Sequence, residues 1–160
     1  MDVEELYCRY AAGERDFSGV DLTRADLNIA KLKYSEHLKP GLNDLSGINL
    51  CSANLTRANL SLVNLCGANL RSANLTLAEL SCTILTAANM QKAILECAQV
   101  GCHLIDVDLR EANLFCTGFA YAKLTRVNLM GARFQVHVDG YLVLRDTIMP
   151  DGSIKNEVYE

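Results

Sequence analysis

No run of apolar residues in this 160-residue sequence is long enough to cross a membrane, although hydrophobic residues make up 50% of it. A membrane-spanning helix needs about 20 consecutive apolar residues. The first residues, 1–5, also lack the positively charged and apolar regions of a secretory signal peptide. The sequence therefore predicts a soluble cytoplasmic protein without a membrane partner.

Enzyme signatures are lacking as well. The sequence contains no G-x-S-x-G or H-E-x-x-H motif and no phosphate-binding G-x-x-x-x-G-K motif. The carboxylates Asp106, Asp108 and Glu111 are close in sequence, but nothing around them predicts a cleft that would shift their pKa values. We interpret them as part of a solvated charged face. The sequence predicts no catalytic residue and no cofactor.

Large charge of one sign is missing from the middle of the chain. The formal net charge is −4, yet residues 45–134 carry seven basic and five acidic side chains. Residues 1–44 hold nine acids and six bases, so the acidity lies toward the ends. A near-neutral central surface does not favour nucleic acid as a partner, and it also lacks the negative charge of a DNA mimic.

The strongest pattern in the chain is a period of five residues between Leu45 and Val100. A large apolar residue occupies all twelve successive positions of this period, and Ala stands two positions before it in eight of the twelve. Asn precedes it directly in seven, so that Ala53-Asn54-Leu55-Thr56-Arg57 is followed by a near copy of itself. Five is neither the helical period of 3.6 nor the strand period of 2. A strict short period predicts a solenoid of stacked repeats.

Tandem A(N/D)LXX units of this kind resemble the pentapeptide repeat family, and the resemblance covers about residues 15–149. It implies an all-β solenoid, a right-handed quadrilateral β-helix of about six coils with four five-residue sides per coil. The central apolar residue and the small residue two before it would point inward. The other three positions would face water.

The two ends of the chain predict caps for this solenoid. Residues 1–14 are expected to form a short N-terminal capping helix over 2–12, with Asp2 and Glu5 as reciprocal capping partners. Leu6 and Tyr10 would share its apolar face, and Gly13 would end it. Residues 15–149 would form the β-helix, with a loop insertion at 33–44. Residues 150–160 would be a C-terminal turn and a flexible, frayed tail.

Counting by twenty residues arranges the apolar centres into four columns. The period loses one residue between Val100 and Leu104, which should tighten one corner, and it then resumes. After Phe134, the next position at which the five-residue period calls for a large apolar residue is Asp139. We therefore interpret 135–141 as a distorted turn. In the second column the residues before the centres predict a hydrogen-bonded polar ladder: Asn49, Asn69, Asn89, Asp108 and Asn128.

The cysteines predict free thiols rather than a metal site. Seven Cys is an odd number without a C-x-x-C motif, which favours reduced thiols. His103, Cys102, Cys97 and Cys116 are near in sequence but would point in diverging directions, so no metal is expected. Cys97 and Cys116 occupy equivalent positions one coil apart. A disulfide between them is allowed by the stacking distance, and two free thiols are favoured.

Outward-facing apolar residues give the candidate interaction surface. Leu77, Ile94 and Phe115 should cluster on the third side of consecutive coils. Exposed apolar clusters mark interaction sites, whereas isolated exposed hydrophobes are ordinary. The 33–44 loop, with His37 and Pro40, is the second candidate, because loops on rigid scaffolds often bind partners.

Two functions follow as expectations. The first is a non-enzymatic scaffold for protein–protein interaction with a regulatory role. It would act as a monomer or weak dimer on an unidentified protein partner. The resemblance includes a cyanobacterial regulator of heterocyst differentiation. Residues 10–17 and 147–152 look like the corresponding ends of cyanobacterial members. The resemblance also implies a second function, because some members of the family mimic DNA and inhibit DNA gyrase; the near-neutral repeat surface of this chain disfavours that function.

Overall fold

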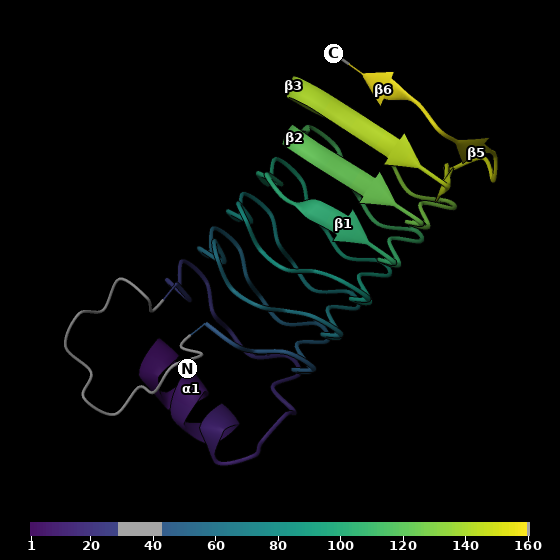
Figure 1. The fold of residues 1–160 in the computed structure, drawn as a ribbon. Coiled ribbons are helices and arrows are strands. Elements are labelled where there is room, and N and C mark those ends of the chain that lie inside the picture. Colours follow the sequence, from purple (N-terminus) through teal and green to yellow (C-terminus); the bar gives the residue numbers. More distant parts are fainter. Residues whose placement is uncertain (29–42, 160) are drawn as a thin grey trace.

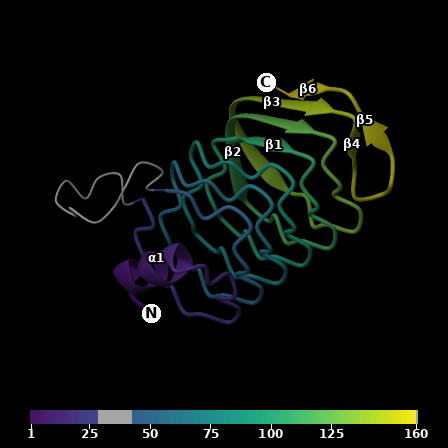
Figure 2. The same ribbon diagram turned by 60° about the horizontal axis from the view of Figure 1, so that its bottom comes forward.

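The computed structural model describes residues 1–28 and 43–159 as a stack of chain turns with one helix at its N-terminal end (Figure 1). We call each turn of this stack a coil. The helix, α1, spans Val3–Ala11. The strands are β1 (His103–Ile105), β2 (Thr117–Thr125), β3 (Val136–Arg145), β4 (Thr147–Ile148), β5 (Ile154–Lys155) and β6 (Val158–Tyr159). They lie at the opposite end of the stack from α1 (Figure 2). No helix in the described part of the chain is long and apolar enough to span a bilayer.

Helix α1 forms where the capping pattern predicted it. The Asp2 carboxylate accepts a hydrogen bond from the Glu5 N–H at 2.7 Å. The reciprocal half of the predicted box is absent between these residues, because the Glu5 carboxylate instead pairs with Arg9, one turn later on the helix, at 3.2 Å. Gly13 follows the helix with a φ of +99°, a conformation that favours glycine and suits a helix end.

Two tyrosines attach α1 to the coils beneath it. Leu6 is fully buried, as its place on the apolar face predicted. Tyr7 is also buried, and its hydroxyl donates to the Leu27 carbonyl at 2.8 Å. The Tyr10 hydroxyl donates to the Ser46 carbonyl at 2.7 Å. The helix therefore covers the apolar cross-section of the first coil and satisfies some of its open backbone carbonyls.

Four ladders of parallel β-bridges hold neighbouring coils together, at the spacing of twenty residues that the columns predicted. The first ladder includes Asn64↔Ile84, the second Asn49↔Asn69, the third Asn54↔Asn74 and the fourth Asn59↔Glu79. Where a pair spans the step between Val100 and Leu104 the spacing is nineteen, as in Asn89↔Asp108 and Ile94↔Asn113, and it returns to twenty at Asp108↔Asn128. The predicted one-residue deletion is thus confirmed, and bridges of the second, third and fourth ladders continue across it.

The bridges are only one residue long because the chain turns after every centre. The Leu55 N–H donates to the Asn74 carbonyl of the next coil at 2.7 Å, and the Asn74 N–H donates back to the Ala53 carbonyl at 2.9 Å. Two residues after the centre, Arg57 has a φ of +59°, which ends the extended conformation. The centres and the small residues before them are almost all buried, and they form one continuous core.

Asparagine side chains form a polar ladder beside the second set of bridges. The Asn69 amide donates to the Asn49 Oδ1 at 2.9 Å, and the Asn49 amide donates to the Asp16 Oδ1 at 2.9 Å. The same oxygen of Asn49 accepts the Cys51 N–H of its own corner at 3.1 Å. These two amides therefore donate toward the N-terminal end of the stack, and this part of the row ends on a carboxylate. Further along the predicted row, the Asp108 carboxylate accepts from the Gln91 amide at 2.6 Å instead.

The interpretation of 135–141 as a distorted turn is wrong. These residues lie almost entirely in β3, which pairs in parallel with β2 from Thr117↔Val136 to Thr125↔Arg145. The register shifts between Ala120 and Ala122, where a β-bulge absorbs an extra residue of β3. Pairing with β2 gives the backbone of this segment hydrogen-bond partners that a turn would lack.

The expectation of a frayed C-terminal tail is also wrong. The turn at Pro150 to Gly152 forms as predicted, and the Gly152 N–H donates to the Met149 carbonyl at 2.9 Å. The turn reverses the chain, so β5 pairs with β4 and β6 pairs with β3, both antiparallel. The reversed segment satisfies backbone groups at the exposed edge of the last coil, as in the bond from the Leu144 N–H to the Glu157 carbonyl at 2.7 Å.

Candidate interaction surface

The three apolar residues Leu77, Ile94 and Phe115, which we call the third-ladder patch, lie on three consecutive coils. The Leu75 N–H donates to the Ile94 carbonyl at 2.7 Å, and Ile94 bridges to Asn113, two residues before Phe115. Leu77 is 46% exposed and Ile94 37% exposed. The structure therefore brings the predicted residues to one face of the stack, with two of them open to solvent.

A cation from the next coil covers the third member of this patch. The Arg133 guanidinium lies over the Phe115 ring, 4.0 Å from its centroid, and Phe115 is only half-exposed. A guanidinium stacked on an aromatic ring is a frequent element of protein interfaces, because both groups present flat, weakly hydrated surfaces. The patch thus combines exposed aliphatic side chains with a positive edge.

Two thiols lie beside the third-ladder patch. The Cys97 N–H donates to the Phe115 carbonyl at 3.1 Å, which places Cys97 one coil below Cys116. Both thiols are free in the structure, as are the other five. Partial burial raises the pKa of the Cys97 thiol, and the neighbouring Cys116 raises it further. Cys97 is therefore held as a neutral thiol rather than as a reactive thiolate.

The loop candidates His37 and Pro40 lie outside the described residues. The described chain stops at Asn28 and resumes at Asn43. The Asn43 side-chain amide donates to the Asn28 Oδ1 at 3.2 Å and to the Leu62 carbonyl at 3.3 Å. The insertion therefore departs from the corner between the fourth and first ladders.

A second apolar surface, which the sequence reasoning missed, runs along this same corner. We call it the fourth-corner ridge, and its side chains are between 41% and 62% exposed: Leu62, Ile84, Tyr121 and Tyr141. The two tyrosine rings meet edge to face with centroids 5.3 Å apart. Leu62 and Tyr121 each follow a fourth-column centre by two residues, so the same counting could have found them. Tyr141 was hidden by the bulge.

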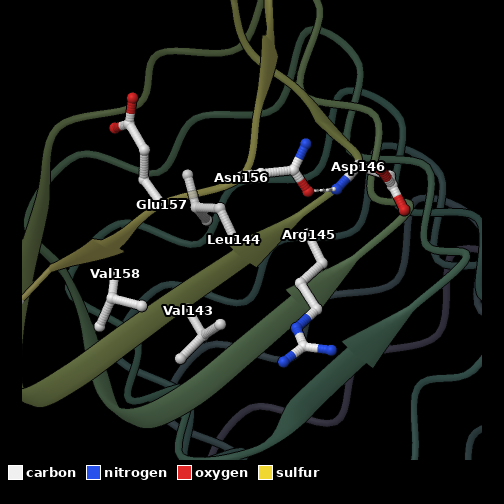
Figure 3. A pocket seen from close by; sticks show the side chains of 7 residues that line it. All are labelled: Val143, Leu144, Arg145, Asp146, Asn156, Glu157 and Val158. Atoms are coloured by element: carbon white, nitrogen blue, oxygen red, sulfur yellow. Dashed lines mark hydrogen bonds between the residues drawn. The ribbon is translucent and has the colours of Figure 1, made fainter.

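An open pocket lies at the C-terminal end, between β3 and residues 156–158 (Figure 3). The Asp146 N–H donates to the Asn156 Oδ1 at 2.9 Å across it. Its charged side chains do not converge, since Arg145 and Glu157 point in different directions (Figure 3). Lys155 lies 2.6 Å from the Glu157 carboxylate and lowers its pKa. The Glu157 carboxylate is therefore held in its ionised form by an ion pair.

Several other charged groups form ion pairs at the surface. Arg126 lies 2.6 Å from Asp106, and its hydrogen bond lowers the pKa of that carboxyl. Arg110 lies 2.7 Å from Asp108. Within residues 1–28 and 43–159, no group of three or more His, Cys, Asp or Glu side chains could hold a metal ion.

Comparisons with known proteins agree with this architecture. The Pentapeptide family, described as pentapeptide repeats (8 copies), matches residues 44–81, 58–96 and 100–135. A trypsin-treated variant of QnrB1, a plasmid-mediated fluoroquinolone resistance protein, shares 13% identity and a TM-score of 0.50, over 84% of this chain and 71% of that one. This likeness shows a similar fold. No curated protein matches the sequence.

Two cyanobacterial structures are also similar. HetL from Nostoc, a pentapeptide repeat protein involved in heterocyst differentiation regulation, has 21% identity and a TM-score of 0.36, over 97% of this chain and 100% of its own. A pentapeptide repeat protein from Cyanothece has 28% identity and a TM-score of 0.40, over 91% of this chain and 97% of its own.

Proposed function

Because the chain belongs to the pentapeptide repeat family, we propose that it is a non-enzymatic scaffold that binds a partner protein through the side of its coil stack. In this proposal the four ladders close into a right-handed quadrilateral β-helix, whose rigid sides present fixed rows of side chains. The third-ladder patch is the observation that carries the proposal. Its partner is a protein with an apolar surface and a negative or aromatic group that faces Arg133.

Residues that can bind a partner must lie at the surface of the stack. Every large side chain of the core is used to fill the stack, so recognition must come from the outward positions. Most of these positions are polar or charged, and Leu77 and Ile94 interrupt them on neighbouring coils. A cluster of exposed apolar side chains beside a guanidinium is a typical composition for the centre of a protein interface.

Gyrase inhibition by DNA mimicry has less support. Residues 45–134 carry seven basic and five acidic side chains, whereas a surface that replaces DNA needs a strong excess of acids. Some of these acids are also paired with arginines, as Asp106 is with Arg126. The likeness to the QnrB1 variant concerns the fold and does not supply the missing charge.

Matched aspartate substitutions at two corners test the proposal. Leu77 and Leu62 have the same place in the repeat, with φ values of 59° and 65°, and are 46% and 57% exposed. The wild type, Leu77→Asp, Ile94→Asp and Leu62→Asp would each be used to capture partners from cells of the source organism. We expect the partner protein that the wild type captures to be lost with Leu77→Asp and with Ile94→Asp, and to be retained with Leu62→Asp.

Three results would overturn this assignment. Equal capture by all four proteins would exclude the third-ladder patch from binding. Loss with Leu62→Asp alone would move the contact to the fourth-corner ridge. Inhibition of DNA supercoiling by micromolar pure protein in a gyrase assay would replace the scaffold proposal with gyrase inhibition.

A further inference from the structure

Strand β3 has an open edge at the C-terminal end of the stack. Its ten residues pair with β2 on one side along nearly their whole length. On the other side, β6 pairs only with Leu142 and Val143, and Leu144 bonds to Glu157. The sheet order is β1-β2-β3-β6, and within the part of the chain that the structure describes no strand pairs with this side of residues 136–140.

The register defines which backbone groups face this edge. In β2, Gly118 directs both its N–H and its carbonyl to the coil below, at 2.9 Å from the Ala98 carbonyl and 2.7 Å from the Val100 N–H. His137 is paired with Gly118, so it directs its own backbone groups toward β2 in the same way. Alternate residues of a strand point in opposite directions, so Val136 and Val138 present their N–H and carbonyl groups to the open edge.

We propose that this edge binds a second copy of the same chain, as an antiparallel strand pair with its two-fold axis at Val138. Val138 and the partner's Val138 would exchange two backbone hydrogen bonds. On the inner face, Val136 and Val138 already pack against the core, so the pair would extend the apolar core from one molecule into the next. The sheet β1-β2-β3 would continue into the sheet of the partner.

Charge complementarity selects a second copy as the occupant. His137 and Asp139 lie on the outer face of β3, with the imidazole Nε2 at 3.3 Å from the carboxylate, and their side chains are 71% and 75% exposed. With the axis at Val138, His137 lies opposite the partner's Asp139, and Asp139 lies opposite the partner's His137. These are non-hydrogen-bonded pairs, in which the side chains approach most closely. Two cross-strand pairs of imidazole and carboxylate would therefore form.

The other end of the stack is built to resist such pairing. Its first coil places Asp16, Asp21 and Asp26 at the bridge positions that face outward. Hydrogen bonds from Ser18 lower the pKa of Asp16, and those from Thr23 lower the pKa of Asp21, so both carboxyls are ionised at neutral pH. A second copy would bring like charges together there. Pairing at one end alone gives a closed dimer and not a filament.

The bulge limits how far the paired segment can extend. Gly140 has a φ of +94°. A β-carbon added to Gly140 would lie only 2.6 Å from the Cε1 atom of the Tyr121 ring. The edge is therefore regular only over Val136 to Asp139, and β6 already occupies the following stretch. A short symmetric edge of this kind supports a weak, concentration-dependent dimer and offers little to longer extended segments.

Charge reversal and charge exchange at positions 137 and 139 test this dimer. Sedimentation velocity would be run on the wild type, on His137→Asp, and on the double variant His137→Asp with Asp139→His. His137→Asp places a carboxylate opposite each Asp139 and should weaken the dimer by about tenfold or more. The double variant restores opposite partners at both positions and should restore most of the affinity. His103→Asp makes the same change on the exposed side of β1 and should have no effect.

The expected wild-type result is a mass that rises from one chain toward two as the concentration increases. In the same range the Val138 amide should exchange its hydrogen more slowly. A wild type that stays monomeric up to its solubility limit would overturn the proposal, and so would growth beyond two chains. Equal dimerisation of the wild type and His137→Asp, or no recovery in the double variant, would exclude the register. Far-UV circular dichroism confirms that each variant is folded.

Discussion

Gly67 and Ala87 allow the conformational cost of the repeat corner to be measured directly. Both stand two residues after a first-column centre, one coil apart, with φ values of +65° and +57°. Sixteen residues other than glycine adopt this conformation in the described chain, each with φ between 47° and 65°. The left-handed conformation is unfavourable for residues with a β-carbon, so each of these corners should carry local strain.

The expected effects of exchanging the two residues have opposite signs. A β-carbon added at Gly67 would meet no atom within 4 Å, so no steric clash contributes. The left-handed conformation then costs about 1–2 kcal/mol, while the smaller entropy of the unfolded alanine chain offsets about 0.4–1 kcal/mol. Gly67→Ala should therefore lower the free energy of unfolding by about 0.5–1 kcal/mol, and Ala87→Gly should raise it by a similar amount.

Urea unfolding followed by circular dichroism measures both changes. Ala88→Gly serves as the control, because Ala88 follows directly, is 1% exposed, and does not have a positive φ. Losing its buried methyl group should destabilise the fold. If Ala87→Gly also destabilises the protein, the corner conformation is not strained.

Three further predictions concern the core, the charged face and the thiols. Phe119→Ala removes a side chain with 0% exposure, and calorimetry should show a loss of about 3–5 kcal/mol; a loss under about 1 kcal/mol would mean that the end coils repack around it. Arg126 lowers the pKa of Asp106, so their pairing stabilises the fold above the ordinary aspartate pKa of about 3.9 and is lost as the pH falls through the lower value in the folded protein. Arg126→Gln should therefore be less stable than the wild type at pH 7 in urea titrations, with the difference vanishing in strong acid; a difference that persists there would indicate lost packing instead. Burial raises the pKa of Cys102 to about 12, so iodoacetamide should label it far more slowly than exposed Cys8 in mass spectra of the native protein; equal labelling would mean that the fold opens at Cys102.

The register of the stack could be predicted from the sequence because its period is strict. A leucine at every fifth position can fill the core only if coils align by multiples of five, and Asn54↔Asn74 shows that alignment. The deletion near Val100 could be predicted for the same reason, since the pattern resumes after a single short step.

The C-terminal coil could not be predicted because two irregularities cancel. Phe119 pairs with Val138, nineteen residues later, whereas Leu124 pairs with Leu144, twenty residues later. One residue is thus missing before Val138 and one is added in the bulge after it. Counting by fives crosses both and places the next centre at Asp139, which makes a regular strand look like a break in the pattern.

The candidate surface could be predicted only in part, because counting locates positions and not side-chain contacts. It placed Leu77 and Ile94 on one face, where the structure has them exposed. The Arg133 guanidinium over Phe115 comes from the next coil, and no spacing rule indicates which way a long side chain will lie. Binding at this surface stays a prediction.

The hydrogen bonds between asparagine side chains of neighbouring coils run in one direction along the stack, and aspartates of the first coil accept the last of them. The amides of Asn49, Asn59, Asn64 and Asn69 each donate a hydrogen bond to the adjacent coil on the N-terminal side, and three of these four bonds end on a carboxylate, as when the Asn59 amide donates to Asp26 at 2.8 Å. If a twenty-residue coil were duplicated in the middle of the stack, each new asparagine could accept a hydrogen bond from the coil on its C-terminal side and donate one to the coil on its N-terminal side. If the same coil were inserted on the N-terminal side of Asp26, the Oδ1 of its asparagine would face the Asp26 carboxylate, and two acceptors would meet without a hydrogen between them. Duplication of a coil should therefore be tolerated in the middle of the stack and not before its first coil.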